Sequence, residues 1–363
     1  MLKKCLLIVC LSTAFYSMPG CRSLVGEKRS GVVIPRRAQI RSSSAVVAAD
    51  LMEVSRGNRL DILGSEKNDN DLWFHVRTTN ADGAEGWIEA QNILSNEMFE
   101  RSQKLWLEDK ATPAQATGQL RSRTNLRLTP DRSGTDNIMF KLDSGSQFDI
   151  VGWKIVPKPR TGEVTDNDDA PRGGAGQQRG QRGKDAGSRT RDDNVPEDDN
   201  ELWYKVRLEQ TSSAAPAGWV YGKQVELTVP GDIIFYRTGR EFVAWQQLDS
   251  DAAVQNGKSR DGASEANPAS WVILEKGSSK NQRQTDGPDF DRIYVLGYDP
   301  RAQEHYTAYR SPNLKGRLPL RVFEEAGQKM FSVNVREANV VVKEMRYKVK
   351  KDEKGHLRVE AVK

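Results

Sequence analysis

Cysteine is scarce in this sequence of 363 residues, and its three cysteines, Cys5, Cys10 and Cys21, all lie near the start. Everything after Cys21 therefore lacks a thiol. This excludes a disulfide bond, a thiolate metal site and a cysteine nucleophile from the rest of the chain.

Histidine is also rare, with three in the chain. His75 and His356 fall in separate predicted β segments, which leaves His305 and its acidic neighbours Asp291, Asp299 and Glu304. No H-x-x-E-H or G-x-S-x-G motif surrounds them. A lone histidine in a polar β turn is most often a surface residue, so we expect no catalysis, no metal and no cofactor. A hydrolase built on His305 is the distant alternative.

The chain lacks both a strong charge excess and a long apolar run. It has 55 basic and 50 acidic residues, and the net charge of +5 falls to +3 without Lys3 and Lys4. A nucleic-acid binder would concentrate basic residues, so nucleic acid is not an expected partner. The apolar run Cys5–Tyr16 is too short to cross a hydrocarbon layer of ~30 Å as a helix.

The first 20 residues have the pattern of a secretory signal peptide, with Lys3 and Lys4 before the apolar run. The ending Met18-Pro-Gly-Cys21 resembles the lipobox of bacterial lipoproteins, in which the cysteine is lipidated and becomes the new N-terminus. This resemblance implies a membrane anchor at Cys21, a tether over 21–37 and, with Arg22 next, the outer membrane of a Gram-negative host. An ordinary leader with an incidental Cys21 is the alternative.

The middle of the chain contains an internal repeat. The predicted copies span 38–94 and 120–228, and four blocks recur in the same order. The matched blocks are 40–41 with 126–127, 55–64 with 143–152, 70–77 with 200–207, and 86–88 with 218–220. Alternation of apolar and polar residues predicts short strands, and glycines separate them.

These blocks resemble the bacterial Src-homology-3-like (SH3b) domain, with glycine, then Trp-aromatic-x-Val, then Gly-Trp. The resemblance implies two small SH3-like barrels in tandem, and binding of cell-wall peptide or peptidoglycan.

Alternation along 72–77 and 202–207 predicts a non-core face that carries one tryptophan and two cations in each copy. Such a face suits a sugar ring or a peptide carboxylate. In the alternative interpretation, the two tryptophans pack under a loop, against Trp87 and Trp219. The ligand-binding candidates are Trp73, His75, Arg77, Trp203, Lys205 and Arg207.

Two segments interrupt the predicted barrels. Residues 95–119 are expected to form a helix over Asn96–Leu107, capped by Asn96, and then a Thr/Ala/Pro-rich link. Residues 157–200 hold almost no large apolar side chain and are expected to form a long disordered insert within the second copy.

Residues 231–363 read as a C-terminal antiparallel β domain, either a barrel or a small sandwich, that matches no family we can name. Near its end, alternation buries Met345, Tyr347 and Val349 and exposes a row of cations on one predicted edge strand. That row either protects the edge from aggregation or docks on an anionic surface. Its members are Arg346, Lys348 and Lys350.

The sequence thus predicts an all-β protein that binds rather than catalyses. We expect a lipid-anchored protein of the bacterial cell envelope that binds wall peptide, peptidoglycan or envelope proteins through its SH3-like domains. In the alternative, a structural adaptor, the barrels are spacers and the C-terminal domain holds a partner protein. Neither interpretation involves a small-molecule substrate.

Overall fold

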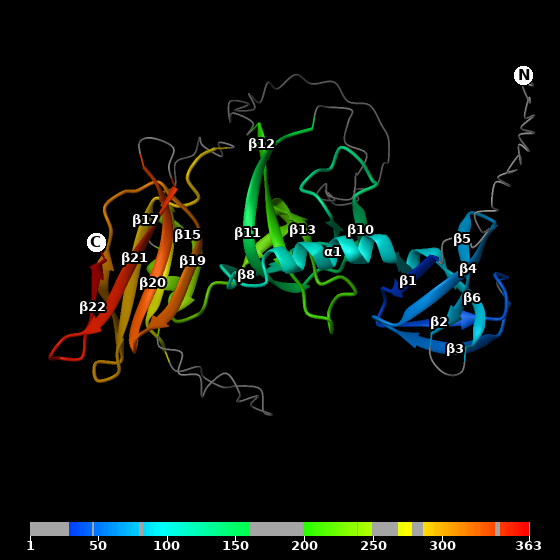
Figure 1. The fold of residues 1–363 in the computed structure, drawn as a ribbon, viewed down its shortest axis with the longest axis horizontal. Helices are drawn as coiled ribbons and strands as arrows, with labels where there is room; N and C mark the ends of the chain where they lie inside the picture. The colour runs from blue at the N-terminus through cyan, green and yellow to red at the C-terminus, as the bar shows by residue number, and fades with distance from the viewer. Residues whose placement is uncertain are drawn as a thin grey trace, which may run out of the picture.

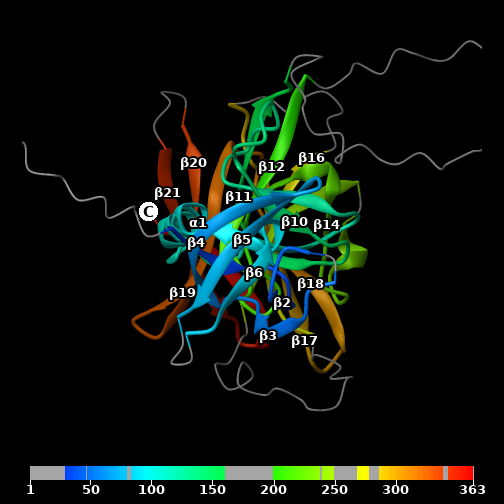
Figure 2. The same ribbon diagram turned by 90° about the vertical axis from the view of Figure 1, so that its right-hand side faces the viewer.

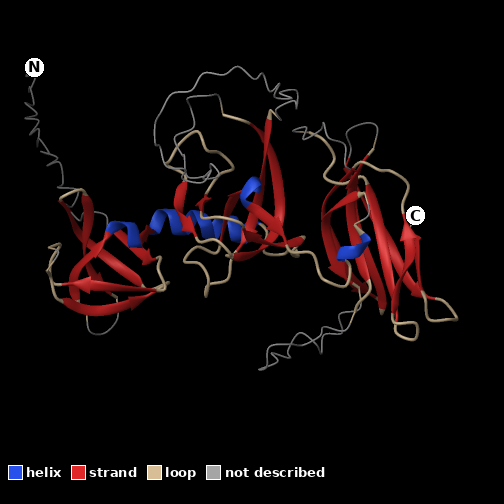
Figure 3. Ribbon diagram, turned by 180° about the vertical axis from the view of Figure 1, so that it is seen from behind, coloured by secondary structure: helices blue, strands red, loops and turns tan. Residues whose placement is uncertain are grey.

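The computed structural model describes residues 29–45, 47–79, 83–159, 199–237, 239–248, 268–277, 286–337 and 342–362. The predicted signal peptide, Cys21 and most of the expected disordered insert (160–198) lie outside these ranges. Within them the chain is all-β, with four antiparallel sheets and a single α-helix, as the sequence predicts. No helix among the described residues is long and apolar enough to cross a membrane. Three bodies lie in a row (Figures 1 and 3), and they overlap when the molecule is viewed from the side of the first body (Figure 2).

The first body is a seven-stranded sheet that begins at Arg29, before the predicted start at 38. Its strands run in the order β3-β2-β6-β5-β4-β1-β7 and enclose a small core that includes Ile40, Leu60 and Val76. The strands are β1 (Arg29–Val33), β2 (Arg37–Arg41), β3 (Asp50–Ser55), β4 (Arg59–Asn68), β5 (Asp71–Thr78), β6 (Glu85–Glu89) and β7 (Ile93–Ser95).

The second body repeats this topology strand for strand, in the order β10-β9-β13-β12-β11-β8-β14. The pairing shifts register once in each long hairpin, between Ile62 and Gly64 and between Ile150 and Gly152. A 3-10 turn precedes the last strand in both bodies, at η1 (Ala90–Asn92) and η3 (Gly222–Gln224). The repeat in sequence is therefore also a repeat in structure. The strands are β8 (Ala116–Leu120), β9 (Thr124–Arg127), β10 (Ile138–Leu142), β11 (Gln147–Pro157), β12 (Asn200–Arg207), β13 (Ala217–Tyr221) and β14 (Val225–Leu227).

Two segments differ from expectation within the second body. Residues 116–119, predicted as a link, form most of β8, which pairs with β11 and β14. The ends of the expected insert are ordered, because β11 and β12 pair as far as Pro157 and Asn200. We refer to the two bodies as the first and second repeats.

Helix α1 (Asn96–Glu108) joins the two repeats (Figure 3). Its N-cap is Ser95, whose side chain accepts a hydrogen bond from the Met98 N–H, so the prediction of Asn96 as the cap is wrong by one residue. The buried Ser102 docks the helix on β13: its Oγ donates to the carbonyl oxygen of Ala217 at 2.5 Å and accepts from the Ala217 N–H at 3.2 Å. The helix thus fixes one repeat on the other.

The third body is a sandwich of two four-stranded meanders. Buried side chains such as Val295, Phe331 and Tyr347 form the core between its sheets. On the first sheet, Ile273 and Leu296 join the core of the second repeat instead. Both faces of this sheet are covered, which explains the continuous apolar runs at 271–274 and 293–296. The strands are β15 (Arg240–Gln247), β16 (Trp271–Gly277), β17 (Arg292–Asp299) and β18 (Glu304–Arg310), then β19 (Gly316–Glu325), β20 (Gln328–Arg336), β21 (Val342–Lys351) and β22 (Leu357–Ala361).

Two glutamines fasten the sandwich to the second repeat. The pairing of β19 with β20 is interrupted between Arg317 and Arg321, which frees the backbone of Leu320. Gln115 is fully buried; its Oε1 accepts from the Leu320 N–H at 2.6 Å, and its Nε2 donates to the Leu320 carbonyl oxygen at 3.1 Å. Gln246, on β15 of the sandwich, donates from its Nε2 to the same oxygen at 2.8 Å and to the Ala114 carbonyl oxygen, just before β8, at 3.3 Å. These bonds satisfy backbone groups that would otherwise be buried without partners.

Candidate binding groove on the second repeat

Equivalent strands in the two repeats carry the same row of outward side chains. In the second repeat, the register pairs Thr117 with Asp149, Asp149 with Arg207, and Arg207 with Ala217. Directly paired residues share one face of a sheet. Their strand neighbour Val206 is fully buried, so this row lies on the face away from the barrel core.

The first repeat has the corresponding row. There Ser30 pairs with Asp61, Asp61 with Arg77, and Arg77 with Glu85. We call each set of four residues the charged row of its repeat. The rows differ in kind at their last position, which is Glu85 in the first repeat and Ala217 in the second.

The charged row of the second repeat is partly covered by α1 and the segment after it. Arg207 Nη1 donates to the Thr112 carbonyl oxygen at 3.0 Å, and Arg207 Nη2 lies 3.6 Å from the Asp149 carboxylate. Next to the row, Lys205 Nζ lies 3.0 Å from Glu108 and 2.5 Å from Asp109. Two predicted ligand-binding cations thus hold the end of the helix in place.

A groove of about 730 Å³ opens beside this covered part of the row. Trp106 of α1 lines it together with Asp149 and Arg207. An aromatic ring, an ion pair and several hydroxyl groups therefore converge on one concave surface, as is typical of a ligand site. Residues that line the groove include Trp106, Thr117, Phe148, Asp149, Arg207 and Thr228.

A second hollow of about 470 Å³ continues on the other side of Trp106. It is lined by Phe99, Leu107 and Leu208 among others, and the side chain of Leu107 is 60% exposed. Trp106 and Leu208 line both hollows. The exposed apolar surface thus runs from the helix into the groove.

Trp73 and Trp203 do not provide aromatic surfaces for a ligand. Their exposed fractions are 7% and 0%. Arg41 lies over the ring of Trp73 at 5.7 Å, and Trp203 packs against Tyr221 at 5.5 Å. Both tryptophans are therefore packed inside the protein, as the alternative interpretation of the sequence expects. Their partners, however, are not Trp87 and Trp219.

His75 and Arg77 lie on β5 of the first repeat, and Arg77 belongs to its charged row. His75 stacks on Trp87 with ring centroids 5.0 Å apart. Arg77 Nε donates to the Glu85 carboxylate at 2.8 Å, and both side chains are more than 40% exposed. A ligand role for this pair stays a prediction.

The row of cations on β21 is not at a sheet edge. β21 pairs with β20 on one side and β22 on the other, so the edge-strand prediction is wrong and edge protection does not explain the lysines. Arg346 lies 3.0 Å from Glu325 and Lys350 lies 2.7 Å from Glu360. Lys348 remains exposed, and docking of this face on an anionic surface stays a prediction.

The histidine cluster suggested by the sequence does not form. His305 is buried rather than at the surface, and its Nε2 lies 2.8 Å from the carbonyl oxygen of Ala269. Asp299 pairs instead with His356, at 3.1 Å. Among the described residues, no group of three or more histidine, cysteine or acidic side chains could hold a metal ion.

Trp106 is the groove residue that sequence reasoning missed as a site. The sequence places it, with Leu105, at helical spacing in the helix expected over Asn96–Leu107. However, Leu105, Trp106 and Leu107 are consecutive, and successive helical residues are separated by about 100°, so they cannot all face the same surface. Three consecutive apolar residues therefore indicate that at least one of them lies outside the packed face of the helix, where it can contact a ligand.

Comparisons with known proteins add little. No family model and no curated protein matches the chain. Among solved structures, it is similar to NlpC2 and NlpC1 from Trichomonas vaginalis, each 12% identical, over 93% of this chain and 97% and 94% of theirs. The TM-scores are 0.16 and 0.15, values at which the likeness carries no argument.

Proposed function

We propose that this protein is a non-catalytic binding protein of the bacterial cell envelope, lipid-anchored at Cys21, which holds a peptide of the wall or of an envelope protein in the groove beside Trp106. The groove carries this proposal. Its volume of about 730 Å³ falls in the range of ligand sites, ~300–1,000 Å³. Its polar and apolar lining suits a peptide, which presents both kinds of group.

The chemistry of the groove supports a peptide in particular. The exposed surfaces of Trp106 and Leu107 can cover an apolar side chain. Arg207 and Asp149 offer opposite charges to a carboxylate and an amine, and Thr117 and Thr228 offer hydroxyl groups to the peptide backbone.

A structural adaptor is the second candidate, and the junction around Gln115 and Gln246 favours it. This junction ties the second repeat to the sandwich through buried hydrogen bonds. Trp153 adds another tie, since its Nε1 donates to Asp289 at 3.1 Å. Modules joined so firmly would hold a bound partner at a fixed distance from the membrane.

The test is binding of the purified full chain to isolated sacculi and to soluble wall peptides. Trp106→Ala should weaken binding by roughly tenfold, because buried aromatic anchors commonly contribute 1–3 kcal/mol or more. The matched control is Trp87→Ala, which removes a half-buried tryptophan from the first repeat. Unchanged binding by Trp106→Ala, or equal losses in both variants, contradicts the proposal for the groove.

The anchor requires a separate test. Cys21→Ala should move the protein from the membrane fraction to the soluble fraction of the envelope, because the lipid would be absent. A mature chain that stays with the membrane after this change contradicts lipid anchoring at Cys21.

A further inference from the structure

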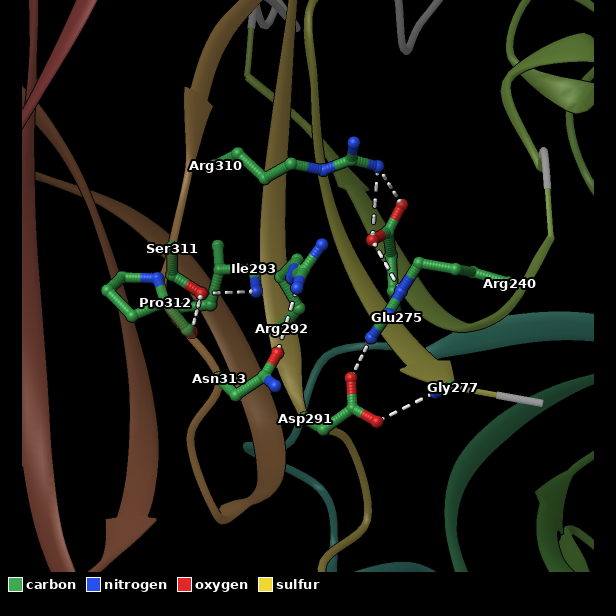
Figure 4. Close-up of polar contacts among 10 residues, drawn as sticks. All are labelled: Arg240, Glu275, Gly277, Asp291, Arg292, Ile293, Arg310, Ser311, Pro312 and Asn313. Atoms are coloured by element: carbon green, nitrogen blue, oxygen red, sulfur yellow. Dashed lines mark hydrogen bonds and ion pairs between the residues drawn. The ribbon is translucent and has the colours of Figure 1, made fainter. Parts of the chain in front are cut away.

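Two arginines of the sandwich pair with two carboxylates, and a third arginine lies on a neighbouring strand (Figure 4). Arg240 of β15 lies 3.1 Å from the Glu275 carboxylate, and Arg310 of β18 lies 3.2 Å from it. Arg240 also pairs with Asp291, which accepts from the Gly277 N–H at 2.7 Å.

Within the part of the chain that the structure describes, no carboxylate pairs with the third arginine, Arg292 of β17. Its Nη2 donates to the side-chain oxygen of Asn313 at 2.9 Å. Its position is set by the sheet, because Arg292 is the register partner of Glu275 on β16. We call Arg240, Glu275, Asp291, Arg292 and Arg310 the arginine cluster.

The arginine cluster has an unbalanced charge, with three guanidinium groups and two carboxylates. Glu275 is 1% exposed and needs cationic partners, since an unpaired buried carboxylate is strongly destabilising. However, Arg240 already pairs with both carboxylates. Burial and repulsion by Arg292 and Arg310 lower the pKa of Arg240, consistent with too much positive charge.

Donors of the arginine cluster remain open on its outer side. Arg310 is 43% exposed, and only its Nη2 bonds to Glu275. Among the described residues, its Nε and Nη1 and the Nη1 of Arg292 have no hydrogen-bond partner, and the Nη1 of Arg292 is not buried. In Figure 4 one terminal nitrogen of Arg310 bonds to Glu275, and the other points away from it. Tyr294 supports the guanidinium of Arg310 from below, at 4.4 Å.

We propose that Arg292 and Arg310 form a binding site for a single oxyanion, a carboxylate or phosphate group. The planar forks of guanidinium groups match the oxygen pairs of both. An added oxyanion would balance the third arginine and offset the repulsion within the cluster. Such a site lies on the sandwich and is separate from the groove of the second repeat.

The test is titration of the full chain with inorganic phosphate and with acetate, at constant ionic strength, by calorimetry. Arg292→Gln and Arg310→Gln should each weaken binding by about tenfold or more, as expected for loss of a charge-assisted hydrogen bond. The matched control is Arg123→Gln, which removes an exposed arginine of the second repeat that lies 3.2 Å from the Asp143 carboxylate. This control should bind as the unaltered chain does.

The outcomes are distinct. Binding of phosphate alone, of acetate alone or of both supports the site and identifies its anion, provided that the two cluster variants lose it. Absence of binding, or equal binding in Arg310→Gln and the unaltered chain, overturns the proposal, as does equal loss in Arg123→Gln. Thermal unfolding of each variant verifies folding. If Arg292→Gln unfolds, Arg310→Gln still decides, because Arg310 is the more exposed residue.

Discussion

The first and second repeats share a topology, a bulge position and a charged row, yet only the second row is covered by α1. The difference lies at one position. Glu85 in the first repeat pairs with Arg77, whereas Ala217 in the second leaves Arg207 free to reach Thr112. Ala217 is also small enough for Ser102 to bond to its backbone.

This comparison teaches how a duplicated module acquires a different role. In the first repeat, the Glu85 carboxylate at the end of the charged row pairs with Arg77 and holds it within the same repeat. In the second repeat, Ala217 stands in place of the carboxylate. There Arg207 bonds to the segment after α1, and α1 docks on the row. The groove beside Trp106 exists because the helix docks there, so the binding surface belongs to the junction and not to either repeat alone.

The largest expected effect comes from making the second row like the first. Ala217→Glu places a carboxylate under α1, where Ala217 is 1% exposed. We expect a loss of about 3 kcal/mol or more in the free energy of unfolding, because the charge is buried or the helix is displaced. Denaturant unfolding measures it. A loss below about 1 kcal/mol would show that the row tolerates either residue.

The reverse change is the control. Glu85→Ala removes an exposed ion-pair partner from Arg77 and should cost at most about 1 kcal/mol, as surface ion pairs contribute little. A larger loss of unfolding free energy for Glu85→Ala than for Ala217→Glu would contradict the comparison of the two rows.

The second largest effect concerns the junction with the sandwich, where the buried Gln115 beside the second repeat bonds to Leu320. Gln115→Ala leaves the N–H of Leu320 without its partner and weakens the hydrogen bonding of its carbonyl oxygen. We expect a loss of about 2–3 kcal/mol in unfolding free energy. The control Gln39→Ala removes an exposed glutamine that bonds to Glu53 in the first repeat, and it should change stability by less than about 0.5 kcal/mol. Equal losses of unfolding free energy in Gln115→Ala and Gln39→Ala would show that the buried junction contributes no more than an exposed glutamine.

The smallest effect compares the two arginines directly. Arg207→Gln loses the charge-assisted bond to the Thr112 carbonyl oxygen, and we expect about 1.5 kcal/mol of destabilisation. Arg77→Gln loses only an exposed pair and should cost less than about 0.5 kcal/mol. Chemical denaturation of both variants measures the difference. If Arg77→Gln proves the more costly change, the first row has a structural role that its exposure does not suggest.

The sequence predicted the duplicated topology well, because recurring strand and glycine blocks are local signals. It could not decide whether Trp73 and Trp203 are buried or exposed. Alternation separates two faces of a strand, but it does not say which face is covered once the long hairpin extends past the core. Leu72, expected inside, is 47% exposed, while its neighbour Trp73 is buried.

The groove and the glutamine junction were also beyond sequence reasoning, for a physical reason. Both depend on contacts between residues far apart in the chain. Gln115 bonds to Leu320, and Trp106 meets Thr228 across the groove only after α1 has docked. A buried polar residue in a Pro/Ala-rich segment carries no local pattern that predicts its partner.

The most direct test of the central claim is photo-crosslinking from equivalent positions of the two charged rows in the intact envelope. A photoreactive residue at Thr117 lies in the groove, whereas one at Ser30 occupies the same place on the first row. We predict adducts with wall peptide or an envelope protein from position 117, identified by mass spectrometry, and few from position 30. Equal adducts from both positions, or none from 117, would contradict the claim that the second repeat carries the binding surface.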